Sequence, residues 1–211
     1  MNRKTTPKVK RGRVQKKHNW TETPDHAYRY AEAGSPVIDE RRPGAGHRHL
    51  LTRRDIETFI RILPDWNELS SGLKAIVLDT YEDNSMGWYR RGVVAVCAWP
   101  KTVWEEWLDE DDSFDPEWLE EHREVMERLG VAIEKQSDRT VIWWTERQAR
   151  AFQLLHILLH ELGHHHDHTT PTRSRKVGAR KVGTRGESYA EEYARRYESR
   201  IWHDYRRHFP L

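Results

Sequence analysis

The residues with the clearest chemical potential in this sequence are His160-Glu161-Leu162-Gly163-His164. Two histidines four residues apart project from one face of a helix, about 6 Å apart, so both imidazoles can reach one metal ion. The glutamate beside the first histidine can then reach a water molecule on that ion. The pattern therefore predicts a metal site at His160 and His164, with Glu161 as the general base.

The helix expected to carry this pattern, which we call the motif helix, reads as a buried one. Thr145 followed three residues later by Gln148 is a capping box, which marks a helix start. From Phe152 to Leu162 apolar residues occur on almost every face of the helix, which is typical of a helix buried in the hydrophobic core. Buried His and Glu side chains must be paired or bound to metal to offset their lost hydration. A satisfied pair of core histidines is the alternative, and the metal site is favoured over it.

The remaining ligand must be a histidine or a carboxylate. The sequence has one cysteine, Cys97, which cannot supply a cysteine cluster for a metal. A hydrolytic zinc site uses three protein ligands and keeps one position for water. Two histidines and one carboxylate on such a helix favour zinc, although the same ligand types also bind Fe(II) in other enzymes.

A second helix, predicted from Glu187 to Tyr205, offers the third ligand. At 100° per residue, Glu187 lies nearest its core face, Glu191 at the flank of that face, and Glu192 towards solvent. Glu187 is therefore the predicted third ligand, and Glu191 is the carboxylate that orients a ligand histidine. The predicted core face consists of Ala190, Tyr193, Ala194, Tyr197 and Ile201.

Together the two motifs resemble the gluzincin branch of zinc metallopeptidases, in which HExxH is completed by a glutamate on the next helix. They look most like the small cytoplasmic ImmA/IrrE-type metallopeptidases, whose second motif runs Glu, two residues, Ala, two residues, an aromatic residue and Ala. Glu187, Ala190, Tyr193 and Ala194 match that order. The resemblance covers about residues 140–202. A basic segment between the motifs and the lack of a visible N-terminal helix-turn-helix depart from it.

The resemblance implies one Zn²⁺ per chain, held by His160, His164 and Glu187 with water in the fourth position. It implies a cytoplasmic zinc-dependent endopeptidase that hydrolyses peptide bonds of a protein or peptide substrate. In that reaction Glu161 takes the proton of the water and passes it to the leaving amine.

Other side chains near the motifs have open roles. His156 precedes His160 by one turn, and it either donates to a ligand, lines the cleft or is an ordinary core histidine. The helix dipole favours cationic histidines at the end of the motif helix, where adventitious metal binding is also open. The histidines at that end are His165, His166 and His168, and the candidate oxyanion donors are Tyr189, Tyr193 and Tyr197.

The expected fold is α+β and zincin-like, of the minimal gluzincin type. A small, mostly antiparallel sheet should pack on the motif helix, which the glutamate helix follows. In the zincin plan the edge strand beside the cleft binds the substrate backbone as an extra strand, and either 93–99 or 140–144 is expected to be that edge. The other predicted elements are a helix at 52–63, strands at 75–78 and 92–99, an acidic helix within 105–124, and a hairpin of 131–133 with 140–144.

Two basic segments suggest a different function. Residues 1–18 carry eight Lys or Arg and no acid, which predicts a disordered arm. The arm and an irregular lead-in occupy 1–49, and the metallopeptidase domain spans 50–211. Residues 171–186 are also basic and read as a loop. The alternative function is thus a metal-stabilised, catalytically idle domain that associates with nucleic acid or protein. Glu161 argues against it, because a structural metal site needs no base.

Composition excludes other classes of protein. Of the 211 residues, 36% are hydrophobic and 33% charged, which fits one domain with a polar tail. No apolar run approaches the roughly 20 residues needed to cross a bilayer, and the N-terminus lacks the apolar stretch of a signal peptide. One cysteine suits a reducing cytosol. We therefore expect a cytoplasmic protein without a membrane partner.

Overall fold

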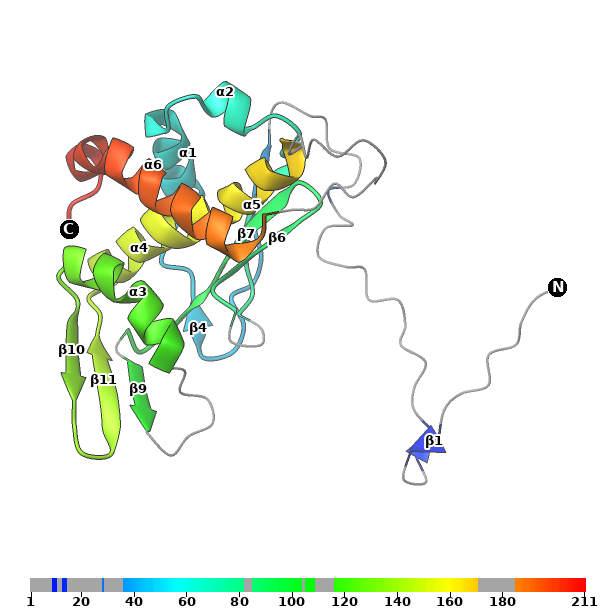
Figure 1. Cartoon of the computed structure of the whole chain (residues 1–211). Helices are drawn as coiled ribbons and strands as arrows, with labels where there is room; N and C mark the ends of the chain where they lie inside the picture. The colour runs from blue at the N-terminus through cyan, green and yellow to red at the C-terminus, as the bar shows by residue number, and fades with distance from the viewer. Residues whose placement is uncertain are drawn as a thin grey trace, which may run out of the picture.

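The computed structural model describes residues 28, 36–81, 85–103, 105–108, 116–170 and 185–211, and two short paired strands, β1 (Val9–Lys10) and β2 (Arg13–Val14). Most of the basic arm and most of 171–186 lie outside the described residues, so the disorder and the loop expected there stay predictions. In the described part, helices and strands form a mixed α+β fold, as expected (Figure 1).

A four-stranded sheet underlies the motif helix. Its order is β3 (Val37–Glu40), β5 (Ala75–Asp79), β7 (Val93–Cys97) and β6 (Gly87–Arg90). The first two pairings, β3 with β5 and β5 with β7, are parallel, and β6 is antiparallel to β7. The expectation of a mostly antiparallel sheet on the motif helix is therefore wrong.

The parallel pairing of β3 with β5 arises from a connection that was not predicted from the sequence. From β3 the chain passes through α1 (Arg53–Ile62) and α2 (Trp66–Leu69) before it enters β5, and such a crossover makes the two strands parallel. Because β3 lies within 1–49, that segment is not irregular throughout. A further strand there, β4 (His47–Arg48), pairs with β8 (Trp99–Pro100).

The predicted first helix is confirmed as α1. Thr52 is its N-cap, and a capping box with Asp55 satisfies backbone donors at the helix start. Ile56 and Phe59 are fully buried on its inner face. The boundaries therefore follow from local sequence.

A second sheet has the order β10 (Ala132–Lys135), β11 (Arg139–Trp143) and β9 (Glu105–Leu108). The predicted hairpin is confirmed as β10 and β11. The acidic helix is found only as α3 (Pro116–Arg128), because residues 105–108 pair with β11 as a strand. Pairing within the sheet overrides their helical pattern, since strand formation depends strongly on neighbouring strands.

The motif helix has three parts: α4 (Glu146–Phe152), a π-helical segment η2 (Gln153–Leu158) and α5 (Leu159–Thr169). The capping box of Thr145 and Gln148 is present at its start. The wider π-helical turn was not predicted, and such turns are frequent at functional sites. The glutamate helix is α6 (Glu187–His208).

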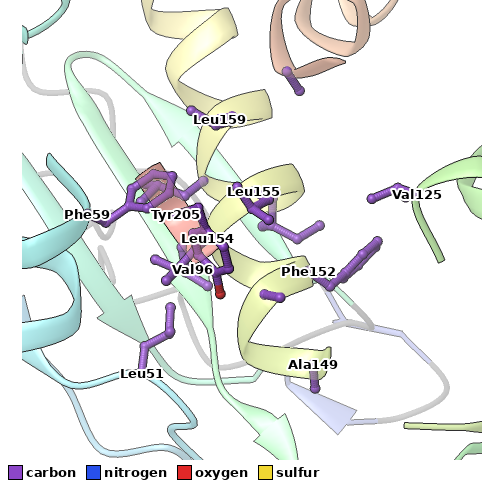
Figure 2. Packing of buried hydrophobic residues seen from close by; sticks show 14 of the residues in the cluster. Leu51, Phe59, Val96, Val125, Ala149, Phe152, Leu154, Leu155, Leu159 and Tyr205 are labelled. Atoms are coloured by element: carbon purple, nitrogen blue, oxygen red, sulfur yellow. The ribbon is translucent and has the colours of Figure 1, made fainter. Parts of the chain in front are cut away.

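The motif helix is buried, as its composition predicts. Figure 2 shows its side chains extending from successive turns into the hydrophobic core, which also includes Phe59, Val96 and Tyr205. No helix among the described residues is both long and apolar enough to span a membrane. The fully buried residues of this stretch include Phe152, Leu154, Leu155, Leu158 and Leu159.

Candidate metal centre

A close contact between α5 and α6 positions the predicted ligands. These two helices lie side by side (Figure 1). A Cβ atom on Gly163 would lie 2.9 Å from the Cα of Ala190 and 3.2 Å from its carbonyl oxygen. Such a separation leaves room for a glycine only. The first turn of α6, which begins at Glu187, therefore lies against the part of α5 that carries His160 and His164.

Three potential ligand atoms form a nearly equilateral triangle. Nε2 of His160 lies 3.1 Å from Nε2 of His164, and each lies 3.2 Å from Oε2 of Glu187. A tetrahedral ion with bonds of about 2.0–2.2 Å places its ligand atoms about 3.3 Å apart. The three atoms therefore fit one metal ion. The Glu187 side chain is 81% exposed, so the group opens to solvent on that side.

Glu191 contacts the other nitrogen of His160. Its Oε1 lies 2.9 Å from Nδ1, so Nδ1 carries the proton and Nε2 is free to bind metal. Burial lowers the pKa of His160, but the carboxylates of Glu191, Glu161 and Glu187 outweigh this effect and raise it. Burial would also raise the pKa of Glu191, yet the bond to His160 and the nearby histidines lower it to about 2. Glu192 is exposed, as helical geometry predicts.

Glu161 is buried beside this group. Burial raises the pKa of its carboxyl to about 8, with His160 opposing the shift and Glu187 adding to it. Strand β6 passes very near: a Cβ on Gly87 would lie 3.0 Å from Oε1 of Glu161 and 2.9 Å from the carbonyl oxygen of Ala95. Gly87 therefore allows β6 and Glu161 to approach each other.

A pocket of about 580 Å³ joins these features. It lies between β6, α3, η2, α5 and α6, and its lining includes Gly87, His160, Glu161 and Glu187. The strand beside it is β6, at the edge of the four-stranded sheet. Neither predicted edge is found, because β7 and β11 are interior strands of their sheets. Strand β6 was not among the elements predicted from the sequence.

Asp167 anchors the start of α6, a role that the sequence analysis missed. Its buried carboxylate accepts hydrogen bonds from the backbone N–H of Arg185 at 2.5 Å, from Nε of Arg185 at 2.7 Å and from the N–H of Gly186 at 3.1 Å. Gly186 has a φ of 77°, which favours glycine. The only signal in the sequence was an aspartate one turn beyond His164.

The histidines at the end of α5 do not form another metal group with the predicted ligands. His165 is buried and its Nε2 lies 3.0 Å from the carbonyl oxygen of Ser71, while Nδ1 of His166 lies 2.7 Å from the hydroxyl of Tyr189. Burial lowers the pKa of both histidines, so they are not the cations that the helix dipole suggested. His168 is exposed beside Tyr89.

The tyrosines of α6 do not reach the site. Tyr189 faces His166, and the rings of Tyr193 and Tyr197 stack in the core with centroids 4.6 Å apart. None of the three lines the pocket among the described residues. None of the three is therefore placed to act as the oxyanion donor that the sequence suggested.

Two further histidines do line the pocket. His156 lies with Nε2 3.5 Å from Oε1 of Glu191, and burial lowers its pKa to about 3, so it is neutral. His122 of α3, which was not predicted as a site residue, also lines the pocket. Nothing in its local sequence separates it from the acidic residues around it.

No protein-family profile, curated protein sequence or solved structure matches this chain. The gluzincin resemblance therefore stays a prediction from residues 140–202. Among the residues that the structure describes, two groups of side chains have the chemistry and spacing to hold a metal ion: His160, His164 and Glu187, and His122, His156 and Glu191.

Proposed function

We propose that this chain is a zinc-dependent endopeptidase of the gluzincin type, which hydrolyses peptide bonds of a protein substrate. One observation carries the proposal: the buried carboxyl of Glu161 lines the same pocket as the convergent ligand atoms. A metal site that only stabilises a fold needs neither a neighbouring base nor a pocket. The proposed zinc ligands are His160, His164 and Glu187.

The chemistry follows from the side chains in place. Zinc at the three ligand atoms would supply Lewis acidity, which polarises a scissile carbonyl and makes water more acidic. Glu161 is suited to take up and release a proton, because burial brings its pKa to about 8. Glu191 fixes the ring orientation and the tautomer of His160 through the 2.9 Å contact to Nδ1.

The edge of β6 supports an endopeptidase. Within the described residues β6 pairs with β7 only, so its other side is available to an extended peptide. Such a peptide would add to the sheet through main-chain hydrogen bonds and pass Gly87, the point at which β6 meets Glu161. Backbone bonds of this kind require no free chain end.

The test compares Glu161→Gln with the wild type in zinc binding and in cleavage of a mixture of denatured proteins. Glutamine keeps the size and the hydrogen-bonding capacity of the side chain but cannot act as a base. We expect unchanged zinc affinity and a loss of cleavage of about 100-fold or more. Glu192→Gln, at an exposed position of α6, is the matched control and should retain both. Zinc loss in Glu161→Gln as large as that in His160→Ala would refute the role of Glu161.

The alternative, a catalytically idle domain that binds nucleic acid, depends on basic residues that lie mostly outside the described part of the chain. The same cleavage assay separates the two functions. An idle domain would leave the protein mixture uncut at every zinc concentration and would bind DNA in a salt-sensitive way.

A further inference from the structure

We propose that His122, His156 and Glu191 form a second site for a divalent transition-metal ion, beside the first. The three side chains come from α3, η2 and α6, and their potential ligand atoms all lie within 4.8 Å of one another. His122 is 8% exposed and His156 4% exposed. The proposal depends on these three residues and not on peptidase activity.

His122 has the hydrogen-bond arrangement of a metal ligand. Its Nδ1 lies 2.7 Å from the carbonyl oxygen of Trp118, so this nitrogen is the protonated donor. Nε2 therefore keeps its lone pair. Metal-binding histidines commonly donate their other ring N–H to a backbone carbonyl or a carboxylate in this way.

His156 is the second buried histidine of this group, and it lines the pocket. Among the described residues neither of its ring nitrogens has a hydrogen-bond partner, although its side chain is only 5% exposed. The 3.5 Å separation of Nε2 from Oε1 of Glu191 is long for a hydrogen bond. It is close to the separation of about 3.3 Å between two ligands of one tetrahedral ion. A metal ion in the pocket, which His156 lines, would bind the lone pair of this nitrogen.

The pocket gives an ion access to this group. Its wall includes His122, His156 and Glu191, together with the first group's His160 and Glu187. Two imidazoles and one carboxylate suit Zn²⁺, Co²⁺ or Ni²⁺ better than Mg²⁺ or Ca²⁺, which prefer oxygen ligands.

Glu191 links the two groups. The same oxygen, Oε1, lies 2.9 Å from Nδ1 of His160 and 3.5 Å from Nε2 of His156. An ion held by Glu191 would compete with the N–H of His160 for this oxygen, and two dications in one pocket repel each other. The second ion should therefore bind more weakly than the first.

The test is a Co²⁺ titration of the metal-free full chain, followed by visible absorption and by equilibrium dialysis. We expect two ions per wild-type chain, with the second bound about 10-fold or more weakly than the first. His122→Ala should bind one ion, and the control His203→Ala, at an exposed position of α6, should bind two. A wild type that binds one ion, or a His122→Ala variant that still binds two, would overturn the proposal.

Two further variants keep the result interpretable. His122→Phe retains a ring against Trp118, whose centroid lies 4.6 Å from that of His122, and should also bind one ion if the alanine variant unfolds. Glu187→Ala should lose the first ion and keep the second. One ion in Glu187→Ala and one in His122→Ala support two separate sites, whether or not the chain cleaves peptides. No ion in Glu187→Ala would show that the second group holds none on its own and would overturn the proposal.

Discussion

The Cα of Ala190 lies 2.9 Å from the position that a methyl group on Gly163 would occupy, and the Cβ of Tyr193 lies 3.1 Å from the same point. Gly163 stands between Glu161 and His164 in the sequence, and Ala190 follows Glu187 by one turn. Two small residues thus fix how near the carboxylate on α6 comes to the imidazoles on α5. The spacing of the proposed metal ligands is a property of this helix crossing.

Gly163→Ala should therefore weaken zinc binding, by about 10-fold or more, and lower stability. Helix propensity alone would favour alanine by about 1 kcal/mol, whereas overpacking at such a contact costs about 1–3 kcal/mol. Competition with a chelator measures the affinity, and thermal unfolding measures the stability. Ser199→Ala, at an exposed site of α6, is the control. A Gly163→Ala protein with unchanged zinc affinity and a higher Tm would show that the contact does not position Glu187.

Three glutamates near the start of α6 should differ in their effect on the first zinc. Glu187→Ala should lose it, because Oε2 lies 3.2 Å from both ligand nitrogens. Glu191→Ala should weaken it by about 10- to 100-fold, as expected for a residue that orients a ligand. Glu192→Ala should have almost no effect, since this side chain faces solvent. The zinc content of each variant after dialysis ranks the three substitutions. A larger zinc loss in Glu191→Ala than in Glu187→Ala would mean that Glu191 is the ligand and Glu187 the orienting residue.

Glu161 should make the metal-free protein less stable as the pH rises from about 5 to about 8. Burial raises the pKa of Glu161 from 4.5 to about 8, so in this range its carboxyl holds a proton in the native state that it has lost in the unfolded state. The loss should level off above pH 8. Urea unfolding of metal-free Glu161→Gln should therefore show a stability gain over the wild type that grows to a few kcal/mol across this range. Parallel curves for the two proteins would mean that Glu161 ionises normally.

Asp167→Asn should destabilise the protein and loosen the start of α6. Burial raises the pKa of Asp167, but its bonds to Arg185 and Gly186 outweigh this and lower it. Its contribution is thus fully present above the unfolded pKa of about 3.9 and is lost as the pH falls through the folded value. We expect a loss of about 1–3 kcal/mol at pH 7 that shrinks below pH 4, with weaker zinc binding. Asp204→Asn, at an exposed position, should leave the stability and the zinc affinity unchanged.

Local sequence predicted the parts of the site that lie on single helices. The spacing of four residues places His160 and His164 on one face of a helix. The same helical period makes Glu187 and Glu192 point to different sides of α6. These side-chain directions therefore follow from the sequence without knowledge of the fold. His122 could not be found in this way, because no period connects α3 to η2 and only packing brings them together. Strands β3 and β6 were missed for a similar reason: each has four residues, and its partner strands define it.

The π-helical segment also sets the rotational phase between α4 and α5. A turn bonded from i to i+5 holds one residue more than an α-helical turn, and one residue corresponds to about 100° of rotation. If Gln153–Leu158 kept all its residues but formed a regular α-helix, α5 would turn by about this angle relative to α4. His160 and His164 would then point away from α6, although their motif would be intact. The rotation of α5 about its axis is therefore as necessary to the site as the identity of the proposed ligands.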